Sequence, residues 1–67
     1  MAKFCVAYID FFDNDLQQKI VEADSMFDAV VTAGHAKEED REYCLSHDDM
    51  QDYFFNGDSA ISVIELQ

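Results

Sequence analysis

The segment Lys3–Phe12 (KFCVAYIDFF) constrains the fold most, because aromatic, β-branched and small residues occupy both faces that a strand would have there. Side chains alternate between the two faces of a strand. The first face carries Phe4, Val6 and Tyr8, and the second carries Cys5, Ala7, Ile9 and Phe11. A strand that is apolar on both faces is typical of the centre of a sheet, or of a sheet whose second face meets a partner.

Two further strands are predicted, one directly after the first strand and one near the other end of the sequence. The triplet Asp13-Asn14-Asp15 favours a turn, because Asn and Asp side chains bond to nearby backbone and tolerate positive φ. The more polar segment Leu16–Ala23 then has the pattern of the returning strand of a β-hairpin. Near the other end of the sequence, the alternation in Ser59–Leu66 predicts a last strand.

A helix is predicted directly after the hairpin. Ser25 is a suitable N-cap, and Asp28 three residues later completes an approximate capping box. The apolar stripe that follows has helical spacing and consists of Phe27, Val30, Val31 and Gly34. The pattern leaves open whether the helix ends at Gly34 or continues beyond Ala36.

A second, shorter helix is predicted over Asp48–Phe55, with Ser46 as its cap and Asn56-Gly57 as its end. The segment Lys37–Leu45 has no decisive pattern and is left open as helix, loop or strand. A chain of 67 residues has room for one domain, which we place at residues 1–67. The expected fold is α+β: a three-stranded antiparallel sheet in the order β-β-α-(α)-β, with one long and one short helix covering one face.

The charge of the chain limits the ligands that it can bind. Fifteen Asp and Glu residues stand against four Lys and Arg residues, for a formal net charge of −11. Direct binding to nucleic acid or to anionic lipid needs clusters of Lys and Arg, so neither is expected here. An acidic surface suits a basic protein partner, and basic surfaces are common on proteins that handle nucleic acid.

Neither secretion nor membrane insertion is expected. No stretch approaches the roughly 20 apolar residues of a membrane-spanning helix, and Met1-Ala2-Lys3 leads into the first strand without the apolar segment of a signal peptide. Two cysteines, Cys5 and Cys44, are too few for the disulfide framework of a small secreted domain. We therefore expect a cytoplasmic protein with reduced thiols.

No pattern predicts catalysis or a cofactor, and we expect a protein that is not an enzyme. Phosphate-binding glycine loops and nucleophile motifs are missing from the sequence. Cys44 and His47 have the C-x-x-H spacing of half a zinc site, but four tetrahedral ligands usually come from two such pairs. Acidic neighbours also raise the pKa of a thiol and weaken it as a nucleophile. No metal is expected, although binding by Cys44 and His47 is left open.

The predicted partner-binding surface is the acidic segment between residues 37 and 58. Desolvated aromatic side chains dominate the energetics of many interfaces, while charges at the rim steer association. Tyr53 and Phe54 are therefore the predicted anchor, and one of Phe54 and Phe55 is expected to fill the core instead. The predicted partner-binding residues are Glu38, Glu39, Asp40, Glu42, Asp48, Asp49, Asp52, Tyr53 and Phe54.

The order of elements resembles that of small acidic bacteriophage early proteins, which take over the host cell. The segment KIVEADSMFDAVVTA is similar to the step in such proteins from a strand ending in Glu-Ala to a Ser-capped helix. The nearest functional analogue is the phage inhibitor of host RNA polymerase. The resemblance implies a phage-encoded inhibitor, acting in the host cytoplasm, that blocks a basic nucleic-acid-handling protein such as RNA polymerase. This is an analogy of topology, and it transfers no residue role.

Several alternatives are compatible with the same pattern. The acidic surface could imitate the phosphates of DNA, or it could merely steer one exposed element into a specific pocket. The target could instead be a restriction or CRISPR-type effector, which would make the chain an anti-defence protein. A homo-oligomeric module is the third alternative, because Ile9, Phe11 and Phe12 on the second sheet face could form a weak homodimer.

Overall fold

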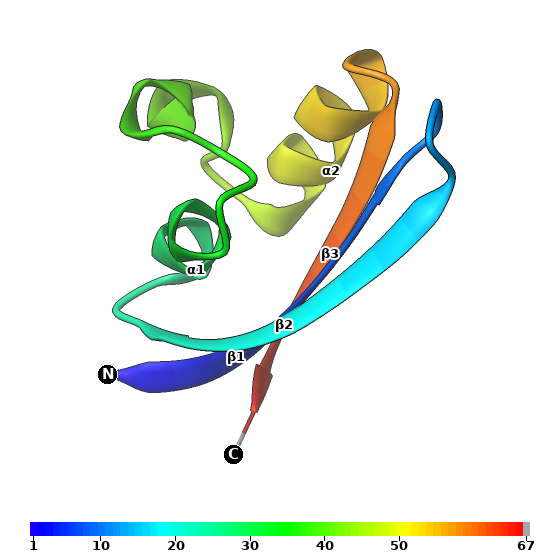
Figure 1. Cartoon of the computed structure of the whole chain (residues 1–67). Coiled ribbons are helices and arrows are strands. Elements are labelled where there is room, and N and C mark those ends of the chain that lie inside the picture. The colour runs from blue at the N-terminus through cyan, green and yellow to red at the C-terminus, as the bar shows by residue number, and fades with distance from the viewer. Residues whose placement is uncertain (67) are drawn as a thin grey trace.

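The computed structural model describes residues 1–66, which contain three strands and three helical segments (Figure 1). In chain order these are β1 (Ala2–Asp10), β2 (Asp15–Ala23), α1 (Met26–Thr32), the 3₁₀ helix η1 (Glu38–Tyr43), α2 (His47–Asn56) and β3 (Ser59–Leu66). The strands form one antiparallel sheet in the order β2-β1-β3, and the helical segments lie on one side of it. The predicted α+β fold with a three-stranded antiparallel sheet is confirmed.

β1 is the central strand, as its two apolar faces predict. It pairs with β2 through the hairpin and with β3 on its other side. In this register Tyr8 lies opposite Ile61 on the face toward the helices, and Cys5 lies between Ile20 and Ile64 on the opposite face. The central place of β1 explains why both of its faces are apolar: one faces the core and the other lies in the middle of a sheet surface.

The turn between β1 and β2 forms where the acidic triplet predicts it. Asn14 adopts a positive φ of 54°, which Asn tolerates better than most residues. Its N–H donates to the Asp10 carbonyl at 2.7 Å, and the Phe12 N–H donates to Asp10 Oδ1 at 2.8 Å. The carboxylate of Asp10 therefore stabilises the turn.

α1 begins and ends at residues with a local reason. The Asp28 N–H donates to Ser25 Oγ at 3.2 Å, and the Ser25 hydroxyl donates to the Asp28 carboxylate at 2.9 Å. Gly34 has φ +89°, and its N–H and that of His35 donate to carbonyls of the last turn at 3.0 and 3.1 Å. These two bonds are those of a Schellman motif, so the helix stops at Gly34 and does not run into the acidic segment.

The segment Lys37–Leu45, which the sequence left open, contains η1. α2 follows, with the predicted cap: the Asp49 N–H donates to Ser46 Oγ at 3.1 Å. Gly57 is the C-cap of α2, and its N–H donates to the Phe54 carbonyl at 3.0 Å. With ten residues α2 is longer than α1, which has seven, so the expectation that the second helix is the shorter one is wrong. The acidic segments η1 and α2 lie side by side above the sheet (Figure 1).

The core lies between the sheet and the two α-helices. α2 packs mainly on β3, and α1 reaches all three strands. Met50, Val6 and Val30 are the largest side chains with no appreciable exposure. The complete set of buried apolar residues is Phe4, Val6, Ala23, Phe27, Ala29, Val30, Ala33, Cys44, Met50, Phe54, Ile61 and Val63.

The other side of the sheet carries no helix within residues 1–66 (Figure 1). We call it the open sheet face. By the strand register it consists of Lys3, Cys5, Ala7 and Ile9 of β1, Leu16, Gln18, Ile20 and Glu22 of β2, and Ala60, Ser62, Ile64 and Leu66 of β3.

Candidate protein-binding site

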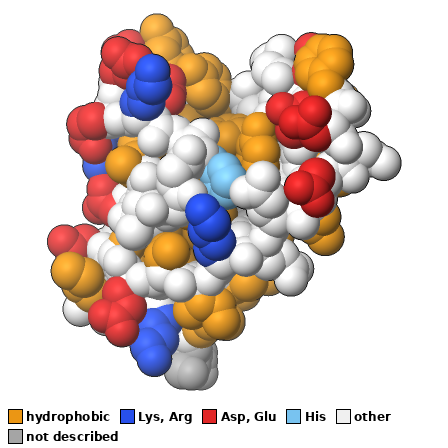
Figure 2. Space-filling view, viewed as in Figure 1, with side chains coloured by type: hydrophobic (Ala, Val, Ile, Leu, Met, Phe, Trp, Pro, Cys, Tyr) orange, Lys and Arg blue, Asp and Glu red, His pale blue; other side chains and the backbone are white. Residues whose placement is uncertain are grey.

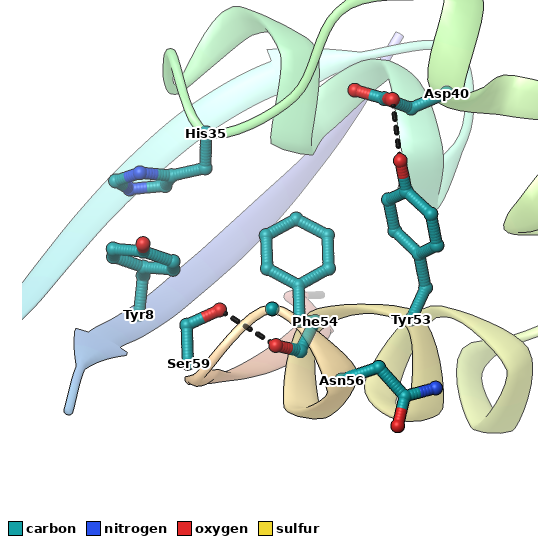
Figure 3. Close-up of a pocket in the computed structure, with 8 residues that line it drawn as sticks. Tyr8, His35, Asp40, Tyr53, Phe54, Asn56 and Ser59 are labelled. Atoms are coloured by element: carbon teal, nitrogen blue, oxygen red, sulfur yellow. Dashed lines mark hydrogen bonds between the residues drawn. The ribbon is translucent and has the colours of Figure 1, made fainter.

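An aromatic cleft opens on the helical side of the molecule, with a volume of about 530 Å³ (Figure 3). This size lies in the usual range for binding pockets. The residues that line it come from β1, the segment after α1, η1, the end of α2 and the start of β3. They are Tyr8, His35, Asp40, Tyr53, Phe54, Asn56, Gly57 and Ser59.

A continuous series of rings forms the wall of this cleft. His35 stacks on Tyr8, with centroids 4.2 Å apart and planes at 16°. Phe54 meets the edge of Tyr8 at 6.0 Å and the edge of Tyr53 at 6.1 Å. Tyr53 in turn stacks on Tyr43 of η1, at 5.4 Å and 3°. Such arrangements are the preferred geometries of aromatic pairs, so the rings hold one another in place.

His35 contributes a buried nitrogen without a hydrogen-bond partner among the described residues, its Nε2. The Schellman motif at Gly34 sets the position of its backbone, and the stack on Tyr8 sets the plane of its ring. Burial, together with the charge of Lys19, lowers the pKa of His35, so the ring is neutral at pH 7. Lys19 itself donates to the Ala33 carbonyl at 3.0 Å, at the negative end of α1.

Asp40 is fixed as a carboxylate at the edge of the cleft. One oxygen accepts from the Lys37 N–H at 2.9 Å and the other from the Tyr53 hydroxyl at 2.8 Å (Figure 3). These bonds, with that of Lys37 the stronger influence, lower the pKa of Asp40. The hydrogen bond to Asp40 in turn raises the pKa of the Tyr53 hydroxyl to about 12. Each carboxylate oxygen can accept a further bond, so Asp40 can still pair with a cation.

The predicted acidic residues lie on η1 and α2, and together they form what we call the acidic face, of which Asp40 lines the cleft. Asp40 is half-buried, and the others are exposed. In the space-filling view, acidic side chains lie on both margins of the molecule, and hydrophobic side chains are visible in the hollow between them (Figure 2). The members of the acidic face are Glu38, Glu39, Asp40, Glu42, Asp48, Asp49 and Asp52.

One part of the acidic face is neutralised internally. Arg41 forms ion pairs with Glu38 of its own segment and with Asp28 of α1. These contacts lower the pKa of both carboxyl groups, and the Arg41 guanidinium also lies 4.8 Å from the centre of the Phe27 ring. Arg41 therefore joins η1 to α1, and Glu38 is less available to a partner than its neighbours are.

The aromatic anchor differs in part from the prediction. Phe54 is buried, because its position on α2 points toward the sheet, so it is the phenylalanine that fills the core, and it also lines the cleft. Its role in partner binding stays a prediction. Phe55 is exposed instead and packs against Phe11 of the hairpin. Tyr53 is partly exposed, as expected, and its stacking partner Tyr43 is exposed but was missed by the sequence reasoning. A tyrosine in an acidic segment was the only signal that could have pointed to it.

The thiol and imidazole groups considered for metal binding are used otherwise. The Val63 N–H donates to His47 Nε2 at 3.2 Å, so this nitrogen accepts a backbone hydrogen bond from the edge strand β3. Cys44 is buried, and burial raises the pKa of its thiol. Within residues 1–66, no three His, Cys, Asp or Glu side chains come close enough together to hold a metal ion.

None of the helices in residues 1–66 is long and apolar enough to cross a membrane. No protein-family model matches the sequence, and comparisons with curated proteins and with solved structures find no significant match. The resemblance to phage early proteins therefore stays a prediction.

Proposed function

We propose that this chain is a non-catalytic inhibitor that covers the basic surface of a nucleic-acid-handling protein with its acidic face. In this proposal one Arg or Lys side chain of the partner enters the aromatic cleft. The observation that carries it is the place of Asp40 and the ring series: a fixed carboxylate lies at the edge of a cleft with aromatic walls, and η1 and α2, which contribute to this cleft, carry exposed carboxylates.

The chemistry of the cleft suits a cation with an apolar stem. Guanidinium and ammonium groups are attracted to aromatic faces and are more strongly held when desolvated. Asp40 supplies a charge partner at the edge, and neutral His35 adds an uncharged ring to the wall. Lys19 is held on the carbonyl end of α1, and Lys37 is the basic residue whose charge acts on Asp40.

The acidic face around the cleft supplies steering. Of the two basic residues between positions 37 and 58, Arg41 is already paired with Asp28 and Glu38. Charges at the rim of an interface mainly raise the association rate, whereas a desolvated anchor sets the dissociation rate. This arrangement supports anchoring with electrostatic steering over imitation of DNA by charge alone. Inhibition follows from competition, because a covered basic surface can no longer bind phosphates.

The first test is capture of proteins from bacterial lysate by the tagged chain, at about 0.05 and 0.5 M NaCl, on either side of the concentration at which the screening length is about 10 Å. We expect one dominant nucleic-acid-handling protein, captured less at high salt. Purified, it should lose DNA or RNA binding when the chain is added. Capture of no specific protein at either salt concentration would overturn the proposal.

Matched variants then separate anchor from steering. Tyr53→Ala should weaken binding at least about thirtyfold at both salt concentrations, the loss typical of an interface hot spot. Tyr53→Phe keeps the ring but loses the hydroxyl that donates to Asp40, so its loss should be smaller than that of Tyr53→Ala. Asp48→Asn with Asp52→Asn should slow association at low salt only, whereas Asp24→Asn with Glu65→Gln, two exposed residues at the other end of the sheet, should change little. If the two double variants behave alike, the acidic face is not the binding surface.

A further inference from the structure

The open sheet face differs from the rest of the surface in its charge. Its charged side chains are Lys3 and Glu22, and these lie directly opposite each other in the register of β1 and β2. The face is therefore neutral, although the chain as a whole carries a formal charge of −11. All of the excess negative charge is placed elsewhere.

The same face exposes large apolar side chains. Leu16 is 60% exposed, Ile20 67%, Ile64 59% and Leu66 36%. In the register, Ile20 and Ile64 flank Cys5 in one row across the three strands, and Leu16 lies beside Ile9 in another. Contiguous exposed apolar surface of this kind marks an interaction site more often than a surface that stays in water.

The size of the face can be compared with what a dimer needs. Strands of eight or nine residues, at about 3.3 Å per residue and about 4.8 Å between strands, give a surface of roughly 27 by 14 Å. Two copies face to face would bury on the order of 800 Å² before side-chain relief adds to it, well below the roughly 1,200–2,000 Å² of stable specific interfaces and in the range of weak, transient ones. This area is compatible with a weak dimer rather than an obligate one.

We propose that the open sheet face binds the same face of a second copy, forming a weak symmetric homodimer with two sheets stacked about 10 Å apart. This face has no net charge with which to select a different partner, and it is complementary to itself. It is also the surface by which two copies of a chain with charge −11 can approach, because its carboxylate, Glu22, lies opposite Lys3. The inference does not depend on the proposed function, because the aromatic cleft lies on the opposite side of the sheet and stays free in the dimer.

Electrostatics gives this dimer a distinctive salt dependence. The two copies repel each other through their remaining charges, and salt screens that repulsion. Salt should therefore strengthen self-association, whereas it should weaken capture of a basic partner by the acidic face. The opposite signs make the two interactions distinguishable in one protein preparation.

The test is sedimentation velocity of the intact chain from the low micromolar range to about 1 mM, the range in which an interface of this size is expected to dissociate. We expect the mass to move from monomer toward dimer, at lower concentration when salt is raised. Ile20→Asp should weaken the association at least about tenfold. Leu45→Asp, which places the same charge on a residue that is 80% exposed away from this face, should leave the association intact.

A chemical readout reports the location of the contact. Cys5 lies in the middle of the open sheet face, so its alkylation by iodoacetamide should slow as the protein concentration rises, while buried Cys44 serves as the internal reference. In Ile20→Asp the slowing should disappear. Ile20→Thr, which keeps a β-branched side chain, replaces it if the circular dichroism spectrum shows that the Asp variant is unfolded. A monomer at all concentrations, or an equal loss of association in Leu45→Asp, would overturn the inference, and neither result bears on capture of a partner by the acidic face.

Discussion

The two faces of the sheet are built from the same three strands, yet they have different relations to water. On the helical side, Val6 of β1 is fully buried and Tyr8 forms the wall of a cleft, whereas on the open side Ile20 and Ile64 remain more than half exposed. The composition of the two faces is similarly apolar. What separates them is the chain between β2 and β3, which folds back over one side only. The comparison shows that an apolar strand face becomes core or interface according to what covers it.

The two sides also differ in charge, and the difference has a physical basis. Asp28 and Asp49 occupy the first turns of α1 and α2, where negative charge is favoured by the helix dipole. The exposed surfaces of η1 and α2 are far from the sheet and can hold many carboxylates in water. A sheet face that is to be covered cannot, because burial of an unpaired charge is costly. The helical side therefore carries the exposed carboxylates of η1 and α2, and the open side has no net charge.

We expect the greatest change in stability from a substitution in β3, where two isoleucines lie on opposite faces of the strand. Ile61 is 4% exposed, and Ile64 is 59% exposed. Ile61→Ala should lower the free energy of unfolding by about 2–5 kcal/mol, because it removes core contacts and leaves a cavity. Ile64→Ala should cost less than about 1 kcal/mol. The measurement is urea denaturation in dilute protein, where the monomer dominates.

Equal losses of stability for the two isoleucines would contradict the difference between the faces, because they would mean that the open face is already covered in the monomer. A difference in stability loss that shrinks at high protein concentration would support it. In that case Ile64 gains burial from the second copy, and its substitution becomes costly only in the dimer.

A smaller effect is expected at the glycine that ends α1 and sets the position of His35. Gly34→Ala places a side chain at φ +89° and should cost about 1–2 kcal/mol of stability, because left-handed backbone is unfavourable for residues with a Cβ. No atom lies within 4 Å of the added Cβ, so the loss would come from the backbone alone. Thermal denaturation measures it.

The matched control is the glycine at the end of α2. Gly57 has φ −95°, and an added Cβ would meet the Phe54 carbonyl oxygen at an ordinary 3.5 Å. Gly57→Ala should therefore be neutral or stabilising by up to about 1 kcal/mol. If both variants lose stability equally, the helical layer does not depend on the Schellman motif.

The smallest effect concerns the pH dependence of the cleft. Burial lowers the folded-state pKa of His35 below its ordinary value of 6.5. Above that value both folded and unfolded chains hold a neutral ring, and below it the unfolded chain takes up a proton first, so stability falls as the pH decreases from about 6.5. The carboxyl groups of Asp28, Glu38 and Asp40 have lowered pKa values, so they affect stability at a more acidic pH than His35 does.

The free energy of unfolding should be measured between pH 5 and 8 in the wild type and in His35→Gln. We expect it to change with pH near pH 6 in the wild type and not in the variant, and the difference is the contribution of His35. Partner binding should weaken over the same range, because a protonated His35 repels a cation in the cleft. Binding that grows stronger on acidification would show that the ligand of the cleft is not cationic.

Much of the fold was predictable because it rests on local signals. The caps at Ser25 and Ser46 and the turn at Asn14 are formed as the sequence indicates, each by atoms within a few residues. The last strand has the predicted bounds, Ser59–Leu66, since alternation fixes its two faces. Only η1 had no such signal, as its bonds to Lys37 and its ion pairs with α1 depend partly on distant groups.

The candidate site was predictable only as a region. The acidic residues of η1 and α2 and the exposure of Tyr53 follow from composition and spacing. Which of Phe54 and Phe55 is buried does not follow from composition and spacing. Neighbours in a helix differ by 100° in direction, and the one that is buried depends on where the sheet lies. The ring series of His35 and Tyr8 joins residues 27 positions apart, which no local pattern reports.

The acidic α+β fold with an apolar central strand could be derived from the amino-acid sequence, because strand alternation, helix caps and net charge are properties of neighbouring residues and of composition. That β1 has one covered and one open face, and that five segments meet at one cleft, is visible only in the folded chain. These features depend on how the helical layer packs against the sheet. Packing is set by the shapes of side chains that are distant in sequence, and it therefore has no local signature.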